Sequence, residues 1–106
     1  MKLFPEHGAW KRGNLHAHSM DSDGWMTQER VLRTFRDMRY DFICMTEHWL
    51  VTEPPDDLPN DLLFLHGVEL NGGDSGVGDF HIIGIDLQDK TPFRRPDDIE
   101  ILTPFD

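Results

Sequence analysis

The order of apolar and polar residues divides the first part of this chain into a strand and a helix. Residues 12–19 are predicted to form the strand. Thr27 is a residue type that caps helix N-termini, and the segment after it, residues 28–39, places its apolar side chains on one helix face. Those side chains belong to Val31, Leu32, Phe35 and Met38. The pattern therefore predicts a strand followed by a helix.

Three continuous apolar runs follow, at residues 42–46, 62–70 and 80–86. Runs of this kind, bounded by polar turns, are typical of strands that are covered on both faces, as in a parallel sheet. A loop rich in proline and aspartate at residues 53–61 and a glycine-rich loop at residues 71–79 separate them. Strands joined by helices or long crossovers predict an α/β fold, in which ligands gather beyond the carboxyl ends of the strands.

The composition narrows the class of protein. At 106 residues the chain fits one small domain. Pro96 and the acidic residues after it resemble the opening of a helix, with proline in its first turn, over residues 96–102. No apolar run approaches the length of about 18 residues that crosses a bilayer, so no membrane partner is expected. Residues 1–18 also lack the apolar core of a secretory signal. The expected location is the cytoplasm.

The net charge and the single cysteine narrow the class of protein further. Twenty acidic residues against ten basic ones give a net charge of -10, which disfavours non-specific binding to nucleic acid. Carboxylates of a metal site would contribute to such a charge, although much of the excess lies in loops. The single cysteine, Cys44, lies in an apolar run and is expected to be a buried, unreactive thiol.

Histidines and acids cluster at the end of the first predicted strand. His16 and His18 close it, and because side chains at i and i+2 of a strand point to the same face, both imidazoles can reach one metal ion. Asp21 and Asp23 follow in a turn-like stretch, where Asp23 can return over the strand end. Taken alone, this segment leaves open the alternative that it holds two surface histidines and two acids that only form a turn.

Further candidate ligands follow at the same level of the sheet. Glu47 and His48 end the second predicted strand, Glu69 ends the third, and His81 opens the next one after the glycine-rich loop. Imidazole nitrogen and carboxylate oxygen are ligands that suit zinc, manganese or iron. Several such residues at successive strand ends favour a metal site over coincidence.

The motifs together resemble those of the polymerase and histidinol phosphatase (PHP) family of metal-dependent hydrolases. The resemblance rests on residues 16–24, 46–48, 67–70 and 81–85 and spans residues 12–86. The segments around residues 12–16 and 40–43 are most similar to the branch of metallohydrolases that includes carbaryl hydrolase.

The resemblance implies a fold and a set of ligands. The implied fold class is α/β, the N-terminal part of a distorted (β/α)7 barrel with two to three divalent ions (Zn, Mn or Fe) at the C-terminal rim of its strands. His16 and His18 would bind one ion, Glu69 would bridge it to a second held by His81, and Asp23 with His48 would hold a third. Glu69 and His48 are the residues to which we assign catalytic roles.

The chain also departs from the family pattern. Glu47 stands where the family more often has aspartate, so its role is open between supporting a ligand, a structural role and solvent exposure. Residues 82–106 contain no histidine, so a later histidine and the closing Asp-x-His motif are missing. Complete barrels run to about 200 residues or more. We therefore expect residues 1–106 to be a single partial PHP domain without the C-terminal ligands.

The expected activity is hydrolysis of a small-molecule phosphate ester by a hydroxide that bridges two metal ions. The alternative on the same site is hydrolysis of an aryl ester, carbamate or amide, because a metal polarises a carbonyl oxygen as readily as a phosphoryl one. A different class of function is a non-catalytic metal-binding fragment that needs its missing C-terminal half as a partner. An exposed strand edge would favour self-association.

Overall fold

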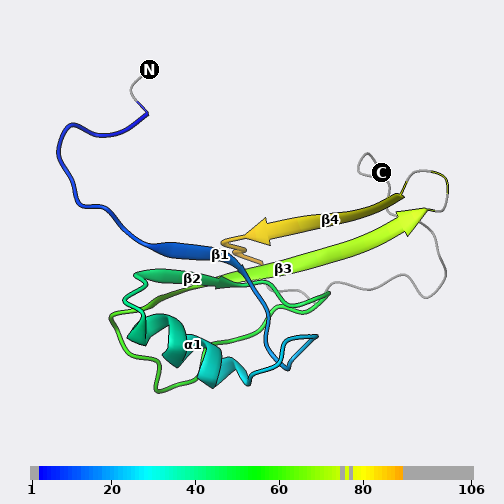
Figure 1. Ribbon diagram of the computed structural model, residues 1–106, viewed down its shortest axis with the longest axis horizontal. Coiled ribbons are helices and arrows are strands. Elements are labelled where there is room, and N and C mark those ends of the chain that lie inside the picture. The colour runs from blue at the N-terminus through cyan, green and yellow to red at the C-terminus, as the bar shows by residue number, and fades with distance from the viewer. Residues whose placement is uncertain (1–2, 75, 77, 90–106) are drawn as a thin grey trace.

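The computed structural model describes residues 3–74, 76 and 78–89. In that part of the chain the elements follow the order β1 (Gly13–Ala17), α1 (Gln28–Asp37), β2 (Phe42–Met45), β3 (Leu63–Asp74) and β4 (Gly78–Ile85). These strands form one sheet of order β1-β2-β3-β4, in which β1, β2 and β3 are parallel and β4 runs antiparallel to β3. Helix α1 lies on one side of the sheet, and β3 and β4 form its longest strands (Figure 1).

Helix α1 begins where the sequence predicts. The Thr27 hydroxyl accepts a hydrogen bond from the backbone N–H three residues later at 3.3 Å, which confirms Thr27 as the N-cap. Val31 and Leu32 are buried, as the apolar helix face requires. The helix ends two residues earlier than predicted, at Asp37, and Met38 is the C-cap with a half-exposed side chain. Met38 therefore does not extend the buried face.

The main apolar core lies between α1 and the sheet. Its buried members are Ala17, Val31, Leu32, Ile43, Met45 and Leu62, and the partly buried side chains around them are Phe35, Tyr40, Leu58 and Phe64. Ile43 and Met45 alternate with Cys44 along β2, so Cys44 points to the opposite face, where it is also fully buried. Strand β2 is thus covered on both sides, as its continuous apolar run predicts.

The face of the sheet away from α1 is more open. Leu63 pairs with Phe42 in the β2–β3 register, and alternation turns it away from Phe64, which packs on the core. The Leu63 side chain is 60% exposed. The Phe42 ring covers Gly13, where a Cβ atom would come within 1.9 Å of the ring, so a larger residue at this position would displace Phe42.

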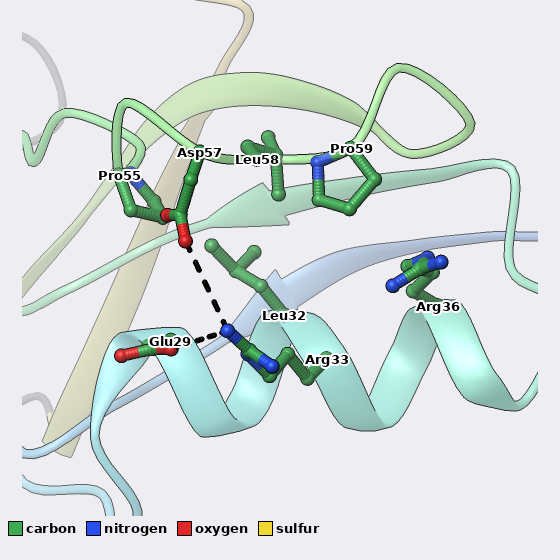
Figure 2. A pocket seen from close by; sticks show the side chains of 8 residues that line it. All are labelled: Glu29, Leu32, Arg33, Arg36, Pro55, Asp57, Leu58 and Pro59. Atoms are coloured by element: carbon green, nitrogen blue, oxygen red, sulfur yellow. Dashed lines mark ion pairs between the residues drawn. The ribbon is translucent and has the colours of Figure 1, made fainter.

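The connection between β2 and β3 folds back over α1 without forming a helix. Its prolines lack the N–H that an inner helical turn needs, which disfavours a helix here. Together with α1 the loop encloses a small cavity of about 80 Å³ (Figure 2). At its edge, Arg33 Nη2 lies 2.8 Å from Glu29 Oε1 and 3.9 Å from Asp57 Oδ2. These exposed ion pairs lie where the loop packs against the helix.

The predicted fold class, α/β and the N-terminal part of a distorted (β/α)7 barrel, is wrong. Such a barrel alternates helices with strands that all run parallel. Across the described residues the structure instead has a small, curled, strand-rich sheet with a single helix, and its last strand is antiparallel. The physical reasons are the proline-rich connection before β3 and the short, glycine-containing reversal after it, neither of which can supply a crossover helix.

The prediction for the last two strands also needs correction. Strand β3 continues to Asp74, through half of the segment expected to be a glycine-rich loop, and β4 begins at Gly78. Gly78 has φ of 96°, a conformation that glycine adopts without a steric cost. Because β4 is the outer strand of a hairpin, it is not buried on both faces, and Ile82 and Ile85 are 42% and 44% exposed.

The helix predicted at residues 96–102 lies outside the described residues. Within the described ranges, α1 has ten residues, and no helix combines the length and apolarity needed to cross a membrane. The expectation that residues 1–106 form one partial domain stays a prediction.

Candidate metal centre

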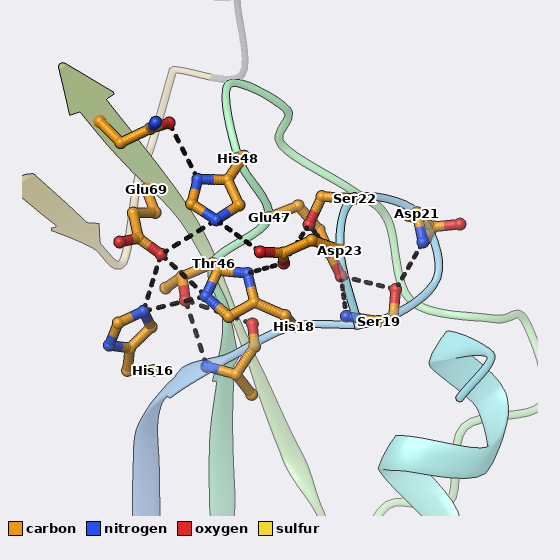
Figure 3. Close-up of polar contacts among 12 residues, drawn as sticks. His16, His18, Ser19, Asp21, Ser22, Asp23, Thr46, Glu47, His48 and Glu69 are labelled. Carbon is orange, nitrogen blue, oxygen red and sulfur yellow. Dashed lines mark hydrogen bonds and ion pairs between the residues drawn. The ribbon is translucent and has the colours of Figure 1, made fainter. Parts of the chain in front are cut away.

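The first group of candidate ligands joins the end of β1 to β3. Glu69 Oε2 lies 2.9 Å from His16 Nε2 and 2.8 Å from His18 Nε2, and these two nitrogens are 3.0 Å apart (Figure 3). The strand order brings these side chains together, because β2 pairs in parallel with both β1 and β3, so the carboxyl ends of all three strands lie at the same edge of the sheet. Three atoms suited to metal binding therefore share one small volume.

A second group shares His18 with the first. Asp23, from the turn after β1, places Oδ2 3.1 Å from His48 Nε2 and Oδ1 3.4 Å from His18 Nδ1. The rings of His18 and His48 are stacked with their centroids 4.8 Å apart. His48 Nε2 also lies 3.7 Å from Glu69 Oε2. The two groups are thus contiguous: the Nε2 atom of His18 faces Glu69 in the first group, and its Nδ1 atom faces Asp23 in the second.

His81 joins the cluster from β4. Its Nδ1 contacts Glu69 Oε1, the carboxylate oxygen that faces away from the first group. The hairpin register makes this possible, because His81 pairs with Asn71, two residues beyond Glu69 on the neighbouring strand. The structure therefore brings together all the predicted ligands: His16, His18, Asp23, His48, Glu69 and His81. His81 belongs to neither of the two three-residue groups.

The remaining histidines and Asp21 lie outside this cluster. His66 Nε2 lies 2.9 Å from Glu53 Oε2, and His7 is exposed in the N-terminal stretch. Asp21 supports the turn through its backbone N–H, which donates to Ser19 Oγ at 3.1 Å. His7, His66 and Asp21 are therefore separate from the cluster of candidate ligands.

The donor atoms fit a cation better than they fit one another. A neutral imidazole carries a single N–H, while a carboxylate oxygen and a bare ring nitrogen only accept. The mutual contacts of His16 Nε2, His18 Nε2 and Glu69 Oε2 cannot all be hydrogen bonds at once. His18 Nδ1 is buried and has no hydrogen-bond partner among the described residues. A divalent cation accepts lone pairs from such atoms, and this ligand set suits zinc, manganese or iron.

Glu69 is the most enclosed acid of the cluster, with a side chain that is 2% exposed. Burial by itself raises the pKa of this carboxyl group, but hydrogen bonds from His16 and His81 and the charges of His16 and His48 outweigh burial. The pKa of Glu69 therefore lies below its ordinary value of 4.5. The group is held as a carboxylate, the form that binds metal.

Glu47 shapes the turn that carries Asp23. It is fully buried, and its Oε1 accepts hydrogen bonds from the Ser19 backbone N–H at 2.6 Å and the Ser19 hydroxyl at 2.5 Å. Its Oε2 accepts a further hydrogen bond from the Ser22 hydroxyl. Of the roles that the sequence leaves open for Glu47, the structure thus shows the structural one and excludes solvent exposure. The turn is tight, because a Cβ atom on Gly24 would come within 2.7 Å of the Ser19 backbone.

Asn71 is a neighbour of the cluster that the sequence analysis missed. Its Oδ1 lies 3.0 Å from His48 Nδ1 and 3.0 Å from Trp49 Nε1. Asn71 follows Glu69 by two positions on β3, so both side chains point to the same face of that strand. The i+2 spacing that singles out His16 and His18 was the available signal for this residue as well.

Comparison with known proteins adds no relative to this picture. No protein-family model matches the chain, and no curated protein sequence matches it significantly.

Proposed function

We propose that this chain binds divalent cations with its histidine and carboxylate cluster and hydrolyses phosphate esters. The observation that carries the proposal is the surroundings of Glu69, whose Oε2 faces His16, His18 and His48 while Oε1 contacts His81. A carboxylate that meets nitrogen ligands with both oxygens is suited to bridge two cations. The resemblance of the motifs to the PHP family supports the same chemistry.

The chain's own groups have distinct parts in this proposal. Zinc, manganese or iron bound by such donors supplies Lewis acidity and lowers the pKa of water toward about 7. Glu69 contributes a buried negative charge, and His16, His18 and His81 contribute ring nitrogens as ligands. Asp23, whose side chain is 62% exposed, and the more buried His48 both line an open hollow beside the cluster. A substrate would approach from this exposed side.

An open hollow of about 490 Å³ lies on that side. It is lined by Ser22, Asp23, His48, Trp49 and Asn71. A hollow of this size can take a small-molecule ester. The cations would supply the positive charge that a phosphate needs, because among the described residues that line the hollow there is no lysine or arginine.

The same hollow favours a second candidate function. The Trp49 indole offers an apolar surface, and the described lining carries the Asp23 carboxylate but no lysine or arginine. An uncharged aryl ester, carbamate or amide suits such a lining better than a phosphate dianion does. Hydrolysis of these substrates at the same cluster is therefore the alternative proposal.

The test measures metal and activity together. Metal content per chain is determined by inductively coupled plasma mass spectrometry for the wild type and for a His16→Ala, His18→Ala double variant. The matched control is a His7→Ala, His66→Ala double variant, which removes the same number of imidazoles outside the cluster. Hydrolysis of p-nitrophenyl phosphate and p-nitrophenyl acetate is then followed for each metal-loaded protein.

The proposal expects bound metal and phosphatase activity in the wild type and in the control variant, and loss of both in the cluster variant. Preferential cleavage of the acetate would favour the second candidate. A folded wild type that takes up no zinc, manganese or iron would refute both proposals.

A further inference from the structure

The contact between Trp49 and Asn71 fixes which way the Asn71 amide points. Indole Nε1–H can only donate a hydrogen bond. The Asn71 atom that lies 3.0 Å from it must therefore be the carbonyl oxygen and not the amide nitrogen. The usual ambiguity between the two ends of an asparagine side chain is thus removed by chemistry.

The orientation of Asn71 determines in turn where His48 carries its proton. His48 Nδ1 lies 3.0 Å from the same Asn71 oxygen. That oxygen only accepts, so Nδ1 must be the N–H, and the neutral ring carries its lone pair on Nε2. Trp49 thus determines the tautomer of His48 through Asn71.

The lone pair of His48 points into the metal cluster. Nε2 lies 3.1 Å from Asp23 Oδ2 and 3.7 Å from Glu69 Oε2. In the neutral form of the ring, three acceptor atoms face one another there, an arrangement that a cation between them stabilises. The opposite tautomer would place an N–H at this point and would satisfy the carboxylates without a cation.

The backbone holds the pair of residues in place. Asn71 lies within β3, where it pairs with His81 of β4. Trp49 adopts a left-handed backbone conformation with φ of 57°, which is costly for a bulky residue, and its N–H donates to the Glu69 carbonyl at 3.0 Å. Asn71 is therefore held within β3, the strand that carries Glu69, and Trp49 is bound to the backbone of that strand.

We propose that Asn71, oriented by Trp49, is a positioning residue that holds His48 in the Nδ1–H tautomer and so presents its Nε2 lone pair to a divalent cation. The inference rests on the proposed function, because it assigns the two residues a role toward the same cluster. When a residue that hydrogen-bonds the non-ligating nitrogen of a metal-binding histidine is removed, metal affinity typically falls by about 10- to 100-fold.

The test reads the tautomer directly in the metal-free protein. Histidine ring nitrogens are labelled with ¹⁵N, metal is removed with EDTA, and two-bond ¹H–¹⁵N correlations are recorded at about pH 8.5, where an ordinary histidine with a pKa of about 6.5 is neutral. The variants are Asn71→Leu, which removes the acceptor, Asn71→Asp, which keeps it, and Trp49→Phe, which removes only the indole N–H. Asn60→Leu is the control, because it makes the same change at an exposed position in a turn. Zinc affinity of each protein is measured by competition with a chelating dye.

The wild type, Asn71→Asp and Asn60→Leu are expected to show the Nδ1–H form of His48. Asn71→Leu is expected to shift His48 to the Nε2–H form and to weaken zinc binding by about 10- to 100-fold. Trp49→Phe is expected to give a mixture of tautomers, because the freed amide can turn its nitrogen toward His48. An Nε2–H form in the wild type, or an Asn71→Leu variant with unchanged tautomer and affinity, overturns the inference. Failure of the proposed function is distinguishable, since a wild type that shows the Nδ1–H form but binds no zinc retains the positioning contact and loses only the metal chemistry.

Discussion

Replacing Glu47 with glutamine tests how the turn that carries Asp23 is held. The buried Glu47 carboxylate accepts hydrogen bonds from the Ser19 N–H at 2.6 Å, the Ser19 hydroxyl at 2.5 Å and the Ser22 hydroxyl. A hydrogen bond to a charged group contributes about 1.5–3 kcal/mol, against about 1 kcal/mol for a neutral pair. Neutralising the acceptor of these three hydrogen bonds therefore costs about 1.5–6 kcal/mol, partly offset because a buried charge is removed. We expect the free energy of unfolding to fall by about 2 kcal/mol.

The assay is urea unfolding of the EDTA-treated protein, followed by tryptophan fluorescence, with the slope of the transition compared between variants. Glu29→Gln is the matched control, since Glu29 makes an exposed ion pair with Arg33 that contributes little. The zinc affinity of Glu47→Gln should also fall, because a looser turn holds Asp23 less firmly. A Glu47→Gln variant that unfolds at the same urea concentration as Glu29→Gln and binds zinc like the wild type would refute the reasoning.

Three further predictions concern titration and metal removal. Burial is the largest influence on Cys44 and raises its pKa above 9.0, so a thiol reagent should label the native protein slowly and the urea-unfolded protein rapidly, and equal rates would contradict the burial. Because the pKa of Glu69 is lowered in the fold, its contribution to stability is complete above about pH 4.5 and is lost as pH falls through the lower folded value. The unfolding free energy of metal-free Glu69→Gln should accordingly decline less steeply in acid than that of the wild type, and parallel curves would exclude the effect. Zinc added at about 100 times its dissociation constant should stabilise the EDTA-treated protein by about 2.7 kcal/mol, and an unchanged melting temperature would count against cation binding.

The sequence by itself determined the local features of the site. The i+2 spacing of His16 and His18 places both imidazoles on one side wherever the backbone is extended, and a strand end provides that conformation. The N-cap at Thr27 and the burial of Cys44 were likewise predictable from a few neighbouring residues. Metal identity, substrate and self-association stay predictions.

The predictions that depended on how distant segments pair were not all confirmed. The prediction of a barrel is wrong because the local sequence pattern does not reveal whether a connection forms a crossover helix or a loop. It also does not reveal whether the next strand runs antiparallel. His81 nevertheless reaches Glu69, but through a hairpin register and not through a rim of parallel strands.

Tertiary structure alone decided the roles of Glu47 and Asn71. As a residue type, Glu47 could lie in solvent, and only the tight turn over it makes it a buried acceptor for Ser19 and Ser22. Asn71 gains its role because Trp49, 22 residues earlier in the chain, donates to it and so determines which of its atoms faces His48. Such contacts join segments that are far apart along the chain, and their geometry is set by strand register and backbone conformation, neither of which short-range sequence patterns specify.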